Sequence, residues 1–127
     1  EEMKLTLRCA DFQGFSNTLK GAEVRREKDA YSNQTILLDM DLKNGTGMAV
    51  WAGRSEKITQ LMGGMALQSQ GTMLINYYEI GSDLFRTFTV FLNKSREATV
   101  TISESQLELS TNDFQGRGFM SICTRVR

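Results

Sequence analysis

The chain has 127 residues, of which 15 are basic and 15 acidic, 40% are apolar, and none is histidine or proline. This length allows one domain, residues 1–127, around a single core. The zero net charge disfavours nucleic acid and anionic membranes as partners, because both are captured by an excess of Lys and Arg. Without histidine, Ser-His-Asp, Cys-His and His-ligated zinc chemistry are excluded.

Apolar and polar residues alternate with a period of two along most of the chain, which is typical of strands with one face on a core. The pattern is clearest in residues 3–9, where Met3, Leu5, Leu7 and Cys9 share a face, and it recurs around Ile36 and Val100. It predicts strands, in chain order, at 3–9, 23–31, 35–42, 47–52, 65–70, 72–80, 84–92, 97–103, 106–110 and 118–126.

Turn signals separate these segments. Asn44-Gly45 predicts a tight hairpin turn because both residues tolerate positive φ, and polar stretches at 81–83, 93–96 and 112–118 predict further turns. Short strands at this spacing indicate an all-β domain, a single antiparallel barrel or sandwich of about 8–10 strands.

One segment, 55–62, could instead form a short helix. Ile58, Leu61 and Met62 would share a helical face, with Ser55 as the N-cap and Gly63-Gly64 ending the helix. A short strand over 56–62 is equally compatible with these residues, and both alternatives stay open at this point.

Two cysteines, Cys9 and Cys123, lie near opposite ends of the chain in apolar segments. They are either buried thiols, which pack like small hydrophobes, or a disulfide joining the first and last strands, which we favour. Closing so long a loop would stabilise the fold by about 4 to 5 kcal/mol in the entropic model. A disulfide persists only in an oxidising compartment, so it predicts a periplasmic or extracellular protein.

Other features bear on the same compartment. No apolar run reaches the roughly 18 residues of a membrane-spanning helix, and we expect any secretory signal to have been removed before Glu1. Asn-x-Ser/Thr triplets at Asn33, Asn44 and Asn93 would suit a glycosylated secreted protein, although about one such triplet is expected by chance in a chain rich in Ser and Thr.

Asp39 and Asp41, two residues apart on one predicted strand, should project from the same face. Paired carboxylates could act as acid and base in glycoside hydrolysis, but acids on the wet face of a strand are the more ordinary interpretation. The stretch 39–45 fails as an EF-hand because Lys43 replaces an oxygen ligand. We therefore expect no catalytic residue, no metal site in this stretch and no cofactor, while a looser calcium site built from acids on several loops stays open.

Large side chains offer candidate contacts with a partner. Trp51 and Tyr78 could share an outward face, and Trp and Tyr are favoured interface anchors, although a place inside the barrel is at least as compatible. Phe114, in the predicted turn beside Asn112 and Asp113, could serve recognition at a loop tip or fold back onto the core. These five residues form the predicted partner-binding site.

The ends of the chain resemble a known class. A cysteine soon after the start, about eight or nine short strands, and the final segment Gly116-Arg117-Gly118-Phe119-Met120-Ser121-Ile122-Cys123 are similar to small periplasmic β-domains of Gram-negative bacteria. In those domains a terminal strand with a Gly-x-Cys-like pattern is tied to the first strand. Here three residues separate the glycine and aromatic residue from Cys123.

That class includes inhibitors of lysozyme and immunity proteins that neutralise the cell-wall-degrading effectors of rival bacteria. The signature of the lysozyme inhibitors, a Ser-Gly followed by spaced tyrosines, does not occur, since Gly81-Ser82 is reversed and is followed by Phe85. The resemblance therefore implies no functional residue. We expect a monomeric protein-binding module that blocks such an enzyme or toxin through loops at one end. A lipocalin-like carrier of a small apolar ligand is the alternative, and a carboxylate hydrolase ranks last.

Overall fold

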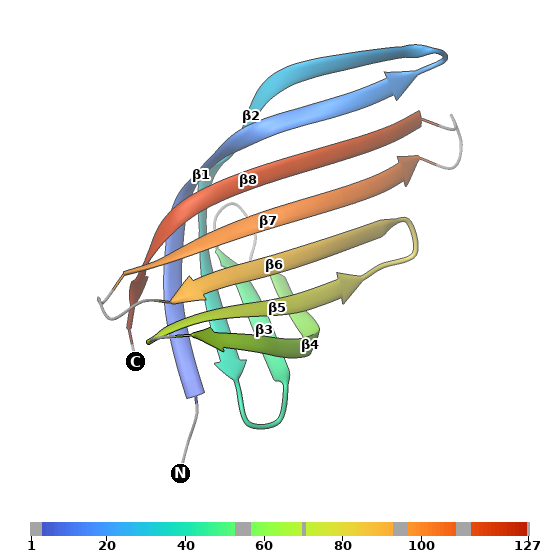
Figure 1. The fold of residues 1–127 in the computed structure, drawn as a ribbon. Coiled ribbons are helices and arrows are strands. Elements are labelled where there is room, and N and C mark those ends of the chain that lie inside the picture. The colour runs from blue at the N-terminus through green and yellow to red at the C-terminus, as the bar shows by residue number, and fades with distance from the viewer. Residues whose placement is uncertain (1–3, 53–56, 70, 93–96, 109–112, 127) are drawn as a thin grey trace.

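The structure is a computed structural model that describes residues 4–52, 57–69, 71–92, 97–108 and 113–126. Eight antiparallel strands follow one another along these residues (Figure 1). Their bounds are β1 (Lys4–Lys20), β2 (Glu23–Asp41), β3 (Thr46–Ala52), β4 (Lys57–Ser69), β5 (Thr72–Ile80), β6 (Leu84–Leu92), β7 (Glu97–Glu108) and β8 (Asp113–Arg125).

Each strand pairs with the next, and β1 also pairs with β8, so the sheet closes into a barrel. The predicted all-β barrel is confirmed, with a closed barrel rather than a sandwich. Closure pairs the edges of β1 and β8 that an open sheet would leave free. Among the described residues, β3 pairs with β2 along residues 35–41. Within the described residues there is no helix long and apolar enough to span a membrane.

Four of the predictions need correction. The segment 57–69 is a strand and not a helix, because Thr59 and Leu61 point inward while Ile58 and Met62 point outward. The predicted strands 23–31 and 35–42 belong to one strand, β2, which ends at Asp41. The predicted strand 97–103 and residues 106–108 of the next belong to β7, while 109 and 110 lie outside the described residues. The first strand continues to Lys20 rather than ending near Cys9.

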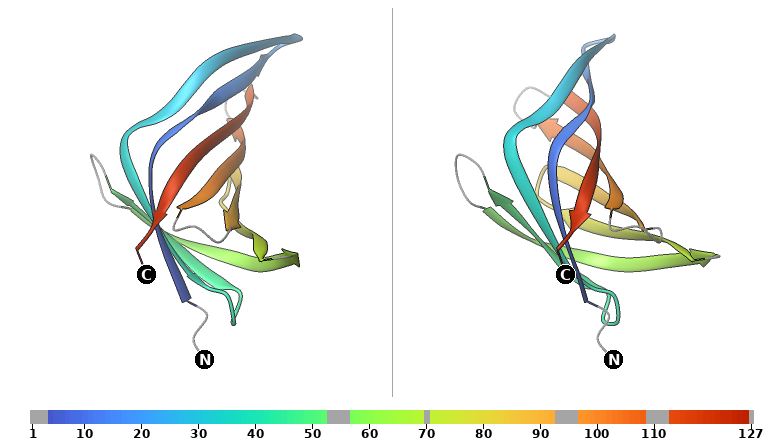
Figure 2. Two further views of the ribbon diagram at one scale, coloured as in Figure 1. Left: turned by 60° about the vertical axis from the view of Figure 1, so that its left-hand side comes forward. Right: turned by 90° about the vertical axis from the view of Figure 1, so that its left-hand side faces the viewer.

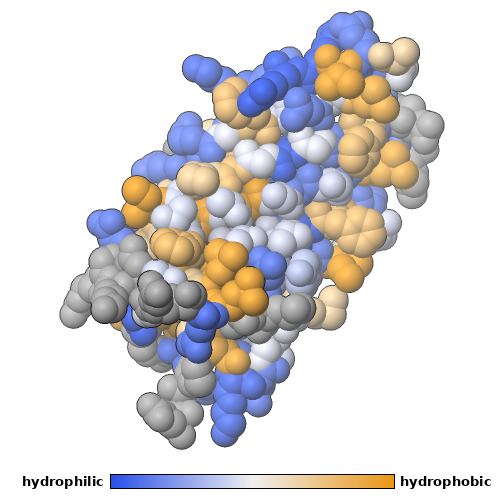
Figure 3. Space-filling model, viewed as in Figure 1, coloured by the Kyte–Doolittle hydropathy of each residue, from blue (hydrophilic) through white to orange (hydrophobic). Residues whose placement is uncertain are grey.

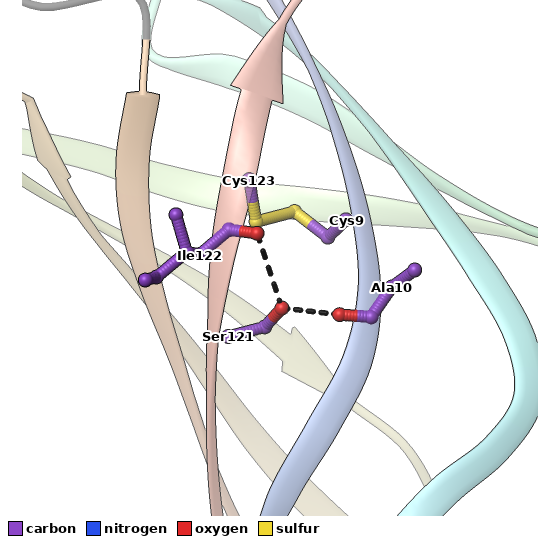
Figure 4. The surroundings of a disulfide bond; sticks show 5 residues. All are labelled: Cys9, Ala10, Ser121, Ile122 and Cys123. Atoms are coloured by element: carbon purple, nitrogen blue, oxygen red, sulfur yellow. Dashed lines mark hydrogen bonds between the residues drawn. A yellow bond between two sulfur atoms is a disulfide. The ribbon is translucent and has the colours of Figure 1, made fainter.

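The seam between β1 and β8 is irregular. The pairing register shifts between Arg8 and Gln13, and Asp11 adopts a φ of 57° within this shift, which marks a β-bulge. The Cys9–Cys123 disulfide crosses the seam here, with the two Cα atoms 4.4 Å apart, and the Ser121 hydroxyl donates a hydrogen bond to the Ala10 carbonyl (Figure 4). The predicted disulfide is thus confirmed, and it holds the first and last strands together where their hydrogen-bond ladder is interrupted.

Close approach of the same two strands depends on a glycine. A Cβ atom at Gly14 would lie 1.7 Å from the Gly118 carbonyl oxygen, a distance that excludes any larger residue without a shift of the backbone. The seam therefore combines a β-bulge, a disulfide and a close backbone contact between Gly14 and Gly118.

The barrel interior has two halves. The half nearer the chain termini, here called the base, is filled with apolar side chains, of which Leu7, Ile36 and Val100 are fully buried. The opposite end, called the mouth, lies where β1 ends and β2 begins, at the right of Figure 1. Figure 2 shows the long β1–β2 hairpin rising along one side of this end.

Candidate functional site

Charged side chains cross the interior between the apolar base and the mouth. Glu79, Arg86, Glu104 and Arg117 lie directly opposite one another on β5, β6, β7 and β8, and Arg117 also reaches Asp29 of β2. We call these five residues the charge belt. Directly opposite residues of antiparallel strands share a face, so the pairing register places the residues from β5 to β8 side by side inside the barrel.

Each neighbouring pair in the belt is bonded. Arg86 Nη1 donates to Glu79 Oε1 at 2.5 Å, and Arg86 Nε donates to Glu104 Oε2. Arg117 Nη1 lies 3.3 Å from Glu104 Oε1, and Arg117 Nε donates to Asp29 Oδ2 at 3.0 Å. The Glu104 side chain is only 2% exposed, so its charge requires these partners to offset the loss of water.

Aromatic rings complete the surroundings of the two guanidinium groups. Arg86 Cζ lies 4.8 Å from the Trp51 ring centroid, and Arg117 Cζ lies 4.9 Å from that of Phe119. Trp51 also meets Phe88 edge to face. Such cation–π contacts add attraction where the cation has lost its hydration.

Trp51 therefore differs from its predicted role. It is 6% exposed and belongs to the core, whereas Tyr78 points outward and is 36% exposed. The two residues do not share a face, because the inward set of β3 includes Ala49 and Trp51. The structure thus places Trp51 inside the barrel and leaves Tyr78 on the exterior.

The outside of the same strands has a different composition. The outward residues around the mouth half are called the mouth wall. They are Tyr78 and Ile80 of β5, Phe85, Thr87 and Thr89 of β6, Thr101, Ser103, Ser105 and Leu107 of β7, Phe114, Gly116, Gly118 and Met120 of β8, Gln13, Phe15, Asn17 and Leu19 of β1, and Val24, Arg26 and Lys28 of β2.

The mouth wall carries few charges. About one residue in four of the whole chain is charged, 24%, whereas Arg26 and Lys28 are the only charged members of this described set and none is acidic. Interface cores in proteins are likewise depleted of charged residues and enriched in aromatic residues, Met and Arg. The composition therefore matches a contact surface better than a solvated one.

Exposed apolar side chains form a row along the rim of the mouth wall. Register places Leu19 opposite both Val24 and Phe114, Phe114 opposite Leu107, and Phe85 opposite Ile80. Five of these residues have side chains that are between 38% and 66% exposed: Leu19, Val24, Ile80, Phe85 and Phe114. In Figure 3 apolar atoms follow the right-hand side of the molecule, beside a paler centre. We call these six residues the mouth row.

Phe114 belongs to this row, but it does not occupy a loop. β8 begins at Asp113, so Phe114 is a strand residue, 44% exposed on the outer face. Asp113 faces the other way, toward the mouth, where its carboxylate lies 3.9 Å from Lys20 Nζ. Asn112 lies outside the described residues.

The two predicted carboxylates line a separate groove near the base. Its volume is about 340 Å³, and Lys4, Asp39, Asp41 and Gln60 are among its lining residues. Asp39 accepts a hydrogen bond of 2.5 Å from the Thr6 hydroxyl. The two acids share a face as predicted, on the side of the barrel formed by β1 to β4.

Asp41 has a local structural role. Its carboxylate accepts hydrogen bonds from the Asn44 side chain and from the backbone N–H groups of Asn44 and Lys43, which closes the β2–β3 turn. The Asn44 side chain, followed by its backbone N–H, holds the pKa of Asp41 below its usual value. A glycosidase acid requires a raised pKa, so Asp41 does not have the property of that acid.

Sequence reasoning missed the charge belt and most of the mouth wall. The signal was present, because strict alternation places Arg86 on the same face as Phe88 and Val90, and Glu104 on the same face as Ile102. Alternation assigns a face, but only the pairing register shows which opposite charge lies across it.

Comparison with known proteins returned no match: no family model, no curated protein and no solved structure is similar to this chain.

Proposed function

We propose that this chain is a monomeric, secreted or periplasmic protein-binding module, and that the mouth wall is its contact surface. The observation that carries the proposal is the exposed mouth row, in which two phenylalanines and four aliphatic residues follow one rim across six strands. An exposed apolar patch of this kind usually marks an interaction site.

The compartment follows from the disulfide. Cys9 and Cys123 are both fully buried and paired, which is compatible with an oxidising environment. The resemblance to periplasmic β-domains supports the narrower proposal that the module is an inhibitor or immunity protein for a cell-wall-degrading enzyme or toxin.

The lipocalin-like carrier is less well supported. A carrier of an apolar ligand needs an open apolar lumen, whereas the interior here is crossed by the charge belt and its base half is filled by buried side chains such as Tyr77 and Phe88. A ligand entering from the mouth would have to separate buried ion pairs.

Site-specific photocrosslinking in the cells that make the protein tests the proposal. A photoreactive phenylalanine analogue replaces Phe114 in one variant and Gln60, an exposed residue of the groove, in the other. We expect one heterologous protein adduct from position 114 and none from position 60. Equal adducts from both positions, a self-adduct at twice the chain mass, or a lipid adduct alone would contradict the proposal.

A further inference from the structure

The acidic and basic residues of 23–29 are sorted by face. In sequence the segment Glu23-Val24-Arg25-Arg26-Glu27-Lys28-Asp29 looks evenly mixed. Pairing with β1 puts Glu27 opposite the buried Ser16 and Asp29 opposite Gly14, so the odd-numbered residues face the mouth interior. Val24, Arg26 and Lys28 face outward. Three acids and one base thus lie on the inner face, and two bases lie on the outer face.

The two outward bases flank an exposed aromatic ring. Arg26 Cζ lies 4.1 Å from the Phe15 ring centroid, and Lys28 is directly opposite Phe15 in the β1–β2 pairing. Phe15 is itself 40% exposed. Its other neighbour across the sheet is Gly118 of β8, which has no side chain to cover the ring. The ring and the two cations form one accessible group, here called the basic edge.

The basic edge is continuous with the mouth row. Leu19 lies on the same face of β1 as Phe15, and Val24 lies on the same face of β2 as Arg26. A partner seated on the mouth row would therefore also cover the basic edge. Charges that become desolvated in this way require opposite charges from the partner.

The charge distribution decides which occupant fits. A second copy docked through its own mouth wall would bring no acidic residue to Arg26 and Lys28, because the described members of that wall include none. Anionic lipid is recognised by clusters of about four to eight Lys and Arg, and here there are two. Between the mouth row and the base, moreover, the wall presents hydroxyl groups of Thr and Ser rather than a continuous apolar band.

We propose that the basic edge is a subsite for carboxylate side chains, so that the partner is a protein whose contact surface combines apolar residues with Asp or Glu at one margin. This inference rests on the proposed function and names the chemistry of its partner. Arg26 contributes a planar guanidinium already ordered against Phe15, which suits a carboxylate better than Lys would.

Two defined peptides serve as probes: one alternates Glu with Leu and Phe, and the other has Lys in place of every Glu. Binding is followed by amide chemical-shift changes in the labelled protein. We expect the acidic peptide to shift amides of 13–19, 24–28 and 114–120, and to bind at least tenfold more tightly than the basic peptide. Raising the salt concentration should weaken it, since these charges are exposed.

The variant Arg26→Glu/Lys28→Glu should weaken the acidic peptide at least tenfold. The matched control is Lys20→Glu/Arg25→Glu, which makes the same change in net charge on the inner face of the same hairpin and should weaken binding less than twofold. Equal loss in both variants, no preference between the peptides, or binding only to vesicles of phosphatidylcholine with phosphatidylglycerol would overturn the inference.

The crosslinking experiment separates this failure from failure of the proposed function. If the adduct from position 114 persists in Arg26→Glu/Lys28→Glu while the acidic peptide shows no preference, the mouth wall remains a protein contact and only the carboxylate subsite is lost. If position 114 yields no protein adduct in the unaltered background, the proposed function itself is wrong.

Discussion

The two faces of the mouth-end strands have opposite compositions. Their inner face carries the charge belt, in which Glu104 is almost completely buried, while their outer face exposes Phe85, Phe114 and Val24. Folding favours apolar residues inside and polar residues outside. The inner face of the base half is apolar, but Leu67, Leu74 and Ile122 are exposed on its outer face. The mouth half differs from the base half in its charged interior, and the row of exposed apolar residues along its outer rim supports contact with another molecule.

The largest expected effect comes from breaking the belt on the inner face. Arg86→Ala would leave Glu79 and Glu104 without their shared cation, and removing one partner of a buried ion pair costs about 3–5 kcal/mol. Chemical denaturation should show a loss of this size. Thr87→Ala, the next residue on the outer face, should cost less than about 1 kcal/mol. Similar losses in the two variants would contradict the distinction between the faces.

Removing the Cys9–Cys123 disulfide tests whether this bond, on the inner face, holds the barrel closed. Cys9→Ala/Cys123→Ala removes the link between β1 and β8 where their register shifts, and loss of a native disulfide in a small domain costs about 2–5 kcal/mol. Denaturation of this variant beside the unaltered protein measures the cost. Unchanged stability would mean that the hydrogen-bonded ladder alone closes the barrel.

The adjacent residues Tyr77 and Tyr78 lie on opposite faces of β5, Tyr77 inside the barrel and Tyr78 outside. Burial, with a smaller contribution from the charge of Asp41, raises the pKa of Tyr77 to about 12 from 10.0. Because the neutral form is favoured in the fold, this contribution to stability is present below pH 10 and is lost as the pH rises from 10 to about 12. Tyr77→Phe should reduce that alkaline loss of stability, which chemical denaturation at a series of alkaline pH values would measure. An identical alkaline loss in Tyr77→Phe would contradict the assignment.

The smallest expected effect concerns the base groove. The pKa of Asp41 is lowered from 3.8, first by the Asn44 side chain and then by the Asn44 backbone N–H. Its contribution to stability is therefore present above pH 3.8 and is lost as the pH falls through the lowered value. Asp41→Asn should flatten the acid side of the stability profile slightly. A steeper acid dependence in that variant would contradict the role of Asp41 in the turn.

Much of the fold was predictable because period-two alternation is a direct consequence of strand geometry. The predictions of strand bounds failed near positions where the alternation of inward and outward residues shifts by one residue. Before the bulge at Asp11 the inward residues have odd numbers, up to Cys9, and after it they have even numbers, from Phe12. The alternation therefore breaks, and the first strand was predicted to end there. In β4 a φ of 108° at Gly63 accompanies a register shift, and the spacing of Ile58, Leu61 and Met62 resembled a helix.

The candidate site was less predictable for a different reason. A contact surface depends on which residues of distant strands lie side by side, and Phe114 meets Leu19 only because the barrel closes between β8 and β1. The polar residues beside Phe114 indicated a turn, so the beginning of β8 was not predicted. Likewise, the acidic and basic residues of 23–29 look mixed in sequence, and the pairing with β1 shows that the acidic ones face inward while Arg26 and Lys28 face outward.

A change of charge at the centre of the mouth wall tests whether this wall is covered by a partner. Ser103 is exposed on β7 opposite Gly118, so Ser103→Glu and Ser103→Gln add side chains of nearly equal size to an uncovered site. If the mouth wall is a contact surface, the two variants will have equal stability, while the crosslink from position 114 falls at least tenfold with Glu relative to Gln. Equal crosslinking in both variants, with equal stability, would contradict the account.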